Sequence, residues 1–207
     1  MQTTVRLFAA ALLASVCLGS TAFGQSRRVV LSFQGGGAGH EENNLNVGLA
    51  AGFGLAVPLM HRLSVAFEAD SWGTRSQTSH RKLYNGRLRV RPFLLGLRYE
   101  FEGNGYFSPY AVAGVGYIET KFWIGTLPAV PDVTIDQTVR SGWAGYFGAG
   151  IAWRLSGFWD FFAEIDYLIR TAPAKTFTQD VALGLTTDEI WVNLHVVYLK
   201  LGLRLLL

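Results

Sequence analysis

The feature that most constrains this chain is the alternation of bulky apolar residues with small or polar ones. From Leu45 to Val57 every odd position is apolar, whereas the even positions hold only Asn, Gly or Ala. Successive side chains of a β-strand point to opposite faces, so this segment is expected to be a strand with two unlike faces. The same period recurs over residues 143–155, 158–170 and 199–207, which predicts an all-β protein.

The segments between the alternating stretches sort into short turns and long loops. Short turns are expected near Pro58–Arg62, Glu102–Gly105 and Ser156–Gly157, and long loops near 35–43, 74–86, 123–139 and 171–188. Alternation of short and long connections is typical of a transmembrane barrel. We therefore predict a closed eight-stranded antiparallel up-and-down β-barrel. Its strands are expected at residues 28–34, 44–58, 62–73, 87–101, 106–122, 139–155, 158–170 and 189–207.

One predicted strand, 87–101, departs from the regular pattern. Its apolar phase slips between Arg91 and Phe93, beside Pro92. Proline cannot donate a ladder hydrogen bond, and bulges relieve such irregularities. The sequence predicts either a β-bulge at this point or a strand end that lies outside the bilayer.

Side-chain size predicts which face of the strands points outward. The face opposite the bulky residues is rich in Gly and Ala, which suits the inside of a narrow barrel better than a surface in water. Charged residues make up only 16% of the chain, against about a quarter in soluble domains. The bulky face is therefore expected to contact lipid, with aromatic girdles near the strand ends. The expected girdle residues are Trp72, Tyr99, Phe101, Tyr106, Phe107, Trp123, Trp143, Trp153, Phe158, Trp159 and Trp191.

Residues 1–24 have the pattern of a cleaved secretory signal peptide. Arg6 precedes an apolar run over residues 7–18, and Ala22 and Gly24 supply small residues before a cleavage site at Gln25. The run is shorter than the roughly 20 residues that a transmembrane helix needs. Val16 stands before Cys17, where a lipoprotein anchor would have a small residue. Residues 25–207 are then the barrel domain, and they contain no apolar helical span.

Charged residues at inward positions predict a network inside the barrel. Buried carboxylates must be paired or neutralised, so Lys200 is expected to bond Glu164 or Asp166. The predicted interior network comprises Glu68, Asp70, Arg98, Arg154, Glu164, Asp166, Lys200 and Arg204.

Two segments give the chain a family resemblance. Ser108–Tyr117 (SPYAVAGVGY) and Phe147–Trp153 (FGAGIAW) resemble the repeated strand phrases of the outer-membrane β-barrel domain family, which includes OmpA-like, opacity-type and small porin-like proteins. The resemblance implies a monomeric eight-stranded barrel that the barrel-assembly machinery inserts. It implies no shared catalytic residues.

Catalytic and cofactor motifs find little support in the sequence. Neither His61 with Ser64 nor Ser79 with His80 has the His-x-Ser spacing of a lipid A deacylase. The stretch Gly35–His40 lacks the Lys and Ser/Thr of a phosphate loop, and His40, Glu41 and Glu42 are weak metal ligands. A net charge of +3 gives no reason to expect nucleic-acid binding. We expect no enzyme activity, no cofactor and no metal.

A cluster of basic residues around the second long loop suggests a partner. No Asp or Glu occurs from residue 74 to residue 99. Arg and Lys bind phosphates, so contact with lipopolysaccharide or another anionic surface polymer is expected, with a solvated loop as the alternative. The candidate residues are Arg75, Arg81, Lys82, Arg87, Arg89 and Arg91. A narrow channel for small solutes and, third, a lipid A-modifying enzyme are the other functions left open.

Overall fold

The computed structural model describes residues 28–40, 45–76, 86–124, 133–180 and 184–207. The expected signal peptide, residues 1–24, lies outside them. Within the described residues, no helix is long and apolar enough to cross a membrane. The strands are β1 (Val30–His40), β2 (Gly48–Met60), β3 (Leu63–Ser76), β4 (Gly86–Glu100), β5 (Phe107–Ile124), β6 (Val133–Val139), β7 (Gly142–Arg154), β8 (Trp159–Ile169), β9 (Thr171–Asp180), β10 (Gly184–Asn193) and β11 (Val196–Leu206).

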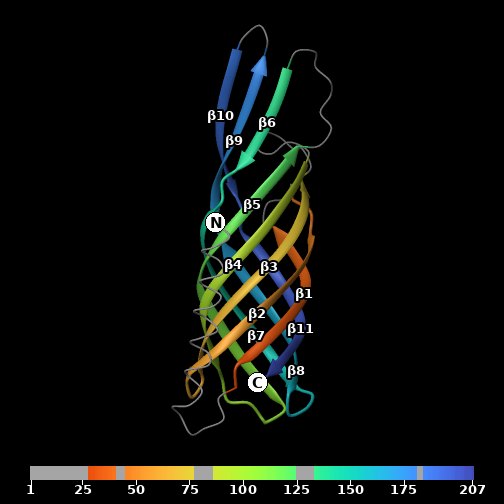
Figure 1. Cartoon of the computed structure of the whole chain (residues 1–207), viewed down its shortest axis with the longest axis vertical. Coiled ribbons are helices and arrows are strands. Elements are labelled where there is room, and N and C mark those ends of the chain that lie inside the picture. The colour runs from red at the N-terminus through yellow and green to blue at the C-terminus, as the bar shows by residue number, and fades with distance from the viewer. Residues whose placement is uncertain (1–27, 41–44, 77–85, 125–132, 181–183) are drawn as a thin grey trace.

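Eight of these strands close into a barrel. Their order around the wall is β1-β11-β8-β7-β5-β4-β3-β2, and β1 closes the cylinder by pairing antiparallel with both β11 and β2. The short connections β2–β3, β4–β5 and β7–β8 lie at the lower end in Figure 1, where the chain also ends. The prediction of a closed eight-stranded antiparallel barrel is confirmed.

The remaining strands form a second sheet that the sequence analysis missed. β6, β9 and β10 pair in the order β10-β9-β6 and stand above the barrel (Figure 1). The expected loops 123–139 and 171–188 therefore contain strands, and the expected strand 189–207 is divided at Leu194 and His195. The division arises because β10 pairs with β9 in the upper sheet, whereas β11 pairs with β1 and β8 in the barrel.

The bulge expected at Pro92 is absent. β4 keeps one register with β3 from Leu63↔Tyr99 to Ser76↔Gly86, and one register with β5 along its whole length. Its even-numbered residues from Leu88 to Arg98 are all buried, so the facing of the side chains never slips. The bulge was wrongly predicted because the bulky apolar residues change from one face of the strand to the other here, while the backbone register stays the same. The alternative, a strand end outside the bilayer, stays a prediction.

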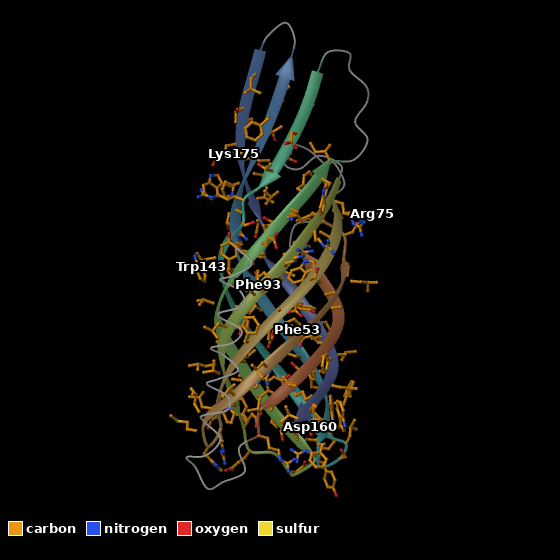
Figure 2. The ribbon with its side chains drawn as sticks, viewed as in Figure 1. Phe53, Arg75, Phe93, Trp143, Asp160 and Lys175 are labelled. Carbon is orange, nitrogen blue, oxygen red and sulfur yellow. The ribbon has the colours of Figure 1, made fainter. Side chains whose placement is uncertain are left out.

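The outer wall has an apolar band bounded by aromatic pairs. Phe107 of β5 lies opposite Trp153 of β7, and Tyr117 lies opposite Trp143, ten residues further along each strand (117 − 107 and 153 − 143). Tilted strands of about 9–11 residues cross a bilayer. Figure 2 locates Phe53, Phe93 and Trp143 on this part of the barrel, and their side chains are exposed. Trp72, expected in a girdle, is instead buried in the lumen.

The lumen is divided into an apolar upper part and a charged part below it. Inward residues of the upper barrel form one apolar core, including Trp72, Leu88, Val90, Ile118, Leu168 and Val196. Lower positions on the same strands carry buried charges such as Glu68, Arg98 and Glu164. Glycines make room for these side chains, since a Cβ at Gly52 or Gly148 would collide with the carboxyl group of Asp70 or Asp166.

Candidate functional site: the charged lumen and the basic outer face

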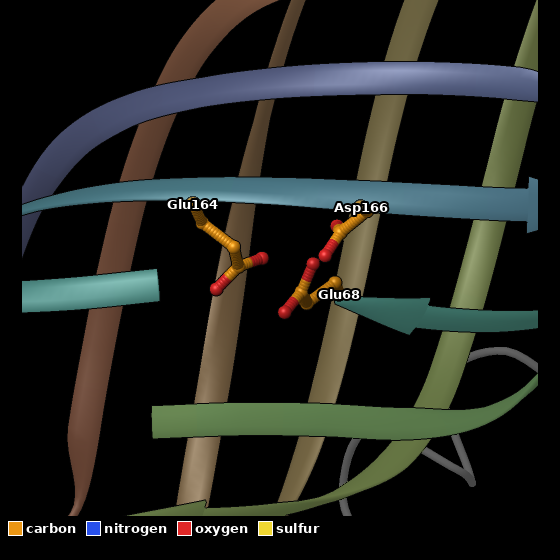
Figure 3. A group of neighbouring side chains, drawn as sticks. All are labelled: Glu68, Glu164 and Asp166. Atoms are coloured by element: carbon orange, nitrogen blue, oxygen red, sulfur yellow. The ribbon is translucent and has the colours of Figure 1, made fainter. Parts of the chain in front are cut away.

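Four strands supply the charged side chains of the lumen. β3 provides Glu68 and Asp70, β4 provides Arg98, β8 provides Glu164 and Asp166, and β11 provides Lys200 and Arg204; each is 5% exposed or less. They share inward-facing positions of the strand repeat, which converge in a narrow barrel. In Figure 3 the carboxyl groups of Glu68 and of Glu164 and Asp166 extend toward the same space.

Lys200 lies at the centre of this cluster. Its Nζ donates a hydrogen bond to Glu164 Oε1 at 3.0 Å and another to Glu68 Oε2. It also forms ion pairs with Asp166 and, at 4.0 Å, with Asp70. The ammonium group is fully buried, so these carboxylates provide the neutralisation that a buried charge requires.

Two arginines complete the cluster below Lys200. Arg98 lies 3.8 Å from Glu68 and 3.9 Å from Glu164, and Arg204 lies 3.7 Å from Glu164. Both guanidinium groups stack on the ring of Tyr110, at 4.9 Å and 4.2 Å from its centroid. The Tyr110 hydroxyl donates to Glu164 Oε2 at 2.8 Å, so one aromatic residue orients both cations and an anion.

Polar residues above Lys200 hold the remaining carboxylate. Gln34 Nε2 donates to Asp70 Oδ1 at 2.7 Å, and the Tyr198 hydroxyl donates to the same oxygen at 3.3 Å. Gln34, Tyr110 and Tyr198 were not among the site residues predicted from the sequence. They share the inward phase of their strands, and that phase was the available signal.

The cluster fills the lumen with the chain's own charges. Oxygens of Glu68, Glu164 and Asp166 lie within 4.8 Å of one another, a spacing that would suit a metal ion. Lys200 contacts all three residues, so a cation of the protein already holds the position between them. The arrangement fits a structural plug better than a metal centre.

Arg154 does not join this cluster. It pairs with Asp160 through Nε and Oδ1 at 2.7 Å, and its side chain is 45% exposed. Asp160 lies at the lower end of the barrel (Figure 2). The expected interior position is corrected, because Arg154 is the last residue of β7 and reaches the rim instead.

A second group of charges covers the outer wall of β3, β4 and β5, above the upper aromatic pair formed by Tyr117 and Trp143. We call it the basic face, and it consists of Arg75, Arg87, Arg89, Arg91 and Lys121. Arg75 lies directly opposite Arg87, and Arg89 opposite Lys121. Like charges in cross-strand pairs destabilise a sheet, so this surface favours a bound anion.

Only one acidic residue lies on the basic face within the described part of the chain. Glu119 is 3.6 Å from Arg91 and 3.6 Å from Lys121. The described face therefore carries five positive charges and one negative charge, a net +4 (5 − 1). The other two candidates, Arg81 and Lys82, lie outside the described residues.

Of the two pairs considered for catalysis, only His61 with Ser64 lies in the described part of the chain. His61 lies in the exposed β2–β3 turn and Ser64 in β3, at the lower end. Ser79, His80, Glu41 and Glu42 lie outside the described residues. In the β2–β3 turn, the Arg62 guanidinium donates a hydrogen bond to the Glu102 carboxylate. This bond lowers the pKa of the Glu102 carboxyl below its ordinary value and raises the pKa of Arg62.

Comparisons with known proteins agree with the fold. No family model matches the chain, and no curated protein matches it. Its structure is similar to that of the outer membrane protein OprG from Pseudomonas aeruginosa (TM-score 0.69, 14% identity, covering 89% of this chain and 98% of that one). It is also similar to a major outer membrane protein from Thermus thermophilus (0.58, 10%, 88% and 100%) and to Neisserial surface protein A (0.54, 10%, 87% and 97%). These likenesses show a shared eight-stranded barrel architecture.

Proposed function

We propose that this chain is an integral outer-membrane barrel that binds the phosphates of lipopolysaccharide on its basic face. The observation that carries the proposal is the outer face of β4. From top to bottom it presents Arg87, Arg89 and Arg91, then exposed Phe93, Leu95 and Leu97, then Tyr99. The same order is found across a membrane, from the lipid phosphates of the outer leaflet, through the hydrocarbon core, to the opposite interface where aromatic residues gather.

The height of the basic face supports lipid phosphates as its partner. Phe93 pairs with Tyr117, and Tyr117 pairs with Trp143, so these residues mark one aromatic level on three neighbouring strands. Arg91 and Arg89 lie two and four residues above Phe93 on β4. Guanidinium groups bind phosphate oxygens with paired, charge-assisted hydrogen bonds. The external side is then the end with the long connections, as in other membrane barrels.

The lumen supports a barrel that is closed to solutes. Lys200 and its carboxylate partners occupy the middle, and the apolar core fills the lumen above them. An eight-stranded barrel is just wide enough for side chains to fill it. Function on the outside of the wall is therefore favoured over the narrow channel left open by the sequence.

Binding to diphosphoryl lipid A tests this proposal directly. The double variant Arg87→Gln/Arg89→Gln in detergent micelles should bind diphosphoryl lipid A at least about tenfold more weakly, since hydrogen bonds between charged groups contribute about 1.5–3 kcal/mol each. The double variant and the wild type should bind dephosphorylated lipid A with equal affinity. The control Arg62→Gln/Lys175→Gln removes the same charge elsewhere and should bind like wild type. Equal affinity of both double variants, or failure of the protein to fractionate with outer membranes, would contradict the proposal.

A further inference from the structure

The barrel wall separates at the upper end of β7. β7 pairs with β8 from Arg154↔Asp160 up to Gly145↔Ile169. Above Ile169 the chain enters β9, which pairs with β6 and β10 instead. In the described residues, Gly142 and its two successors therefore have a strand partner only on the β5 side.

A groove opens on the outer wall where the strands part. It is a shallow, widely open depression rather than an enclosed pocket, and the space in it is about 500 Å³. Val115, Trp143, Gly145 and Ile169 give it an apolar lining, with Arg170 at one side. Gly145 leaves it open, since a Cβ added there would meet no atom within 4 Å.

Arg170 brings a buried positive charge to this groove. Its guanidinium donates to the carbonyl oxygen of Ile118 at 3.0 Å and to that of Arg140, while the residue is only 5% exposed. Among the described residues, no carboxylate lies within ion-pair distance of it. A buried charge without a counter-charge is costly.

We propose that the groove binds one acyl chain of lipid A, with a phosphate of its headgroup near Arg170. This inference rests on the proposed location in the outer membrane. Trp143 places the groove at the upper aromatic level, where chains of the outer leaflet meet their headgroups. At that height the occupant of an apolar groove in the wall is a lipid, and Arg170 favours an anionic one. The site is separate from the basic face, since none of the charged residues of that face lines the groove.

The test uses variants that change the groove without touching the basic face. Gly145→Leu fills the groove with a side chain that meets no clash in the backbone. Ala149→Leu adds the same kind of bulk to the same exposed face of β7, four residues away from the groove. Both proteins, in detergent micelles, are titrated with diphosphoryl lipid A, and native mass spectrometry counts the lipids retained on each barrel.

We expect Gly145→Leu to bind one of its lipids at least about tenfold more weakly than the wild type does, so that this lipid is no longer retained. Ala149→Leu should retain as many lipids as the wild type. Arg170→Met should weaken the binding of diphosphoryl lipid A more than the binding of its dephosphorylated form. Arg87→Gln/Arg89→Gln should still retain the groove lipid, which separates this site from the basic face. Wild-type retention by a folded Gly145→Leu variant would overturn the proposal, as would preferential retention of phosphatidylglycerol over lipid A.

Discussion

Replacing Lys200 with Met removes the central cation of the lumen while keeping most of the side chain's volume. The cluster contains four carboxylates, those of Glu68, Asp70, Glu164 and Asp166, and three cations, Arg98, Lys200 and Arg204. With every group charged, the net charge changes from −1 (3 − 4) in the wild type to −2 (2 − 4) in the variant. At an effective dielectric constant of about 20, two unit charges 3.0 Å apart, as Lys200 and Glu164 are, attract by about 5.5 kcal/mol before desolvation is counted.

Desolvation offsets much of that attraction, so the measured loss should be smaller than the Coulomb sum. Removal of one partner from a buried ion pair costs about 3–5 kcal/mol, because the other charge stays buried. With a urea dependence of about 1–3 kcal/mol per M, Lys200→Met should lower the unfolding midpoint by about 2 M. The assay is tryptophan fluorescence of the folded protein in detergent micelles during urea titration.

A matched control separates burial from charge alone. Lys175 forms an ion pair with Glu189 at 3.2 Å in the upper sheet, but both side chains are nearly half exposed. Lys175→Met should change stability by about 1 kcal/mol or less. The double variant Lys200→Met/Asp166→Asn restores the net charge to −1 (2 − 3) and should recover part of the loss. If Lys200→Met unfolds at the same urea concentration as Lys175→Met, the account of the lumen as a charge-paired plug is refuted.

Two further predictions concern backbone space and modularity. Gly148→Leu should abolish the heat-modifiable folded band on a gel, because the new Cβ would collide with Asp166 and lie 2.7 Å from the carbonyl oxygen of Ile165. Gly145→Leu on the same strand should fold, since a Cβ there meets no atom within 4 Å. Folding of both variants would contradict this account of the packing. Replacing residues 175–189, a range that includes most of the pairing part of β9 and β10, with a short turn should leave the barrel folded, since the wall pairs β8 directly with β11. Loss of the folded band would show that the upper sheet is needed for barrel closure.

The barrel could be predicted from the sequence because its strands have two faces that differ in size and polarity. The alternation around Phe53 and around Ile165 marks one face as exposed and the other as buried, and the structure places both side chains on the outer wall. Turn residues set the lower ends of β2, β4 and β7 within a few residues. These signals are local, so one sequence suffices to detect them.

The upper sheet could not be predicted by the same signals. β9 contains Pro173 and several threonines, and most of β10 is exposed, so neither strand shows a bulky face against a small one. β6 does alternate, with Val133, Ile135 and Val139 in one phase. Its partner is β9, however, more than 30 residues away, and such pairing depends on tertiary contacts that periodicity does not report.

The apparent slip in β4 shows how one strand can pass between two solvents without changing its register. Below the level of Phe93 its outer residues are apolar and its inner residues include Gly96 and Arg98; above it the outer residues are arginines and the inner ones are Leu88 and Val90. A wall in hydrocarbon needs apolar side chains outside, whereas a wall in water can bury them inside. On the proposed location in the outer membrane, the inversion between Arg91 and Phe93 corresponds to the membrane surface, and Tyr117 and Trp143 lie opposite Phe93 and each other on the next strands. Both proposed lipid contacts, the basic face and the groove beside Gly145, meet the wall at this height, so a measured insertion depth that placed Phe93 in water would remove the physical basis of both.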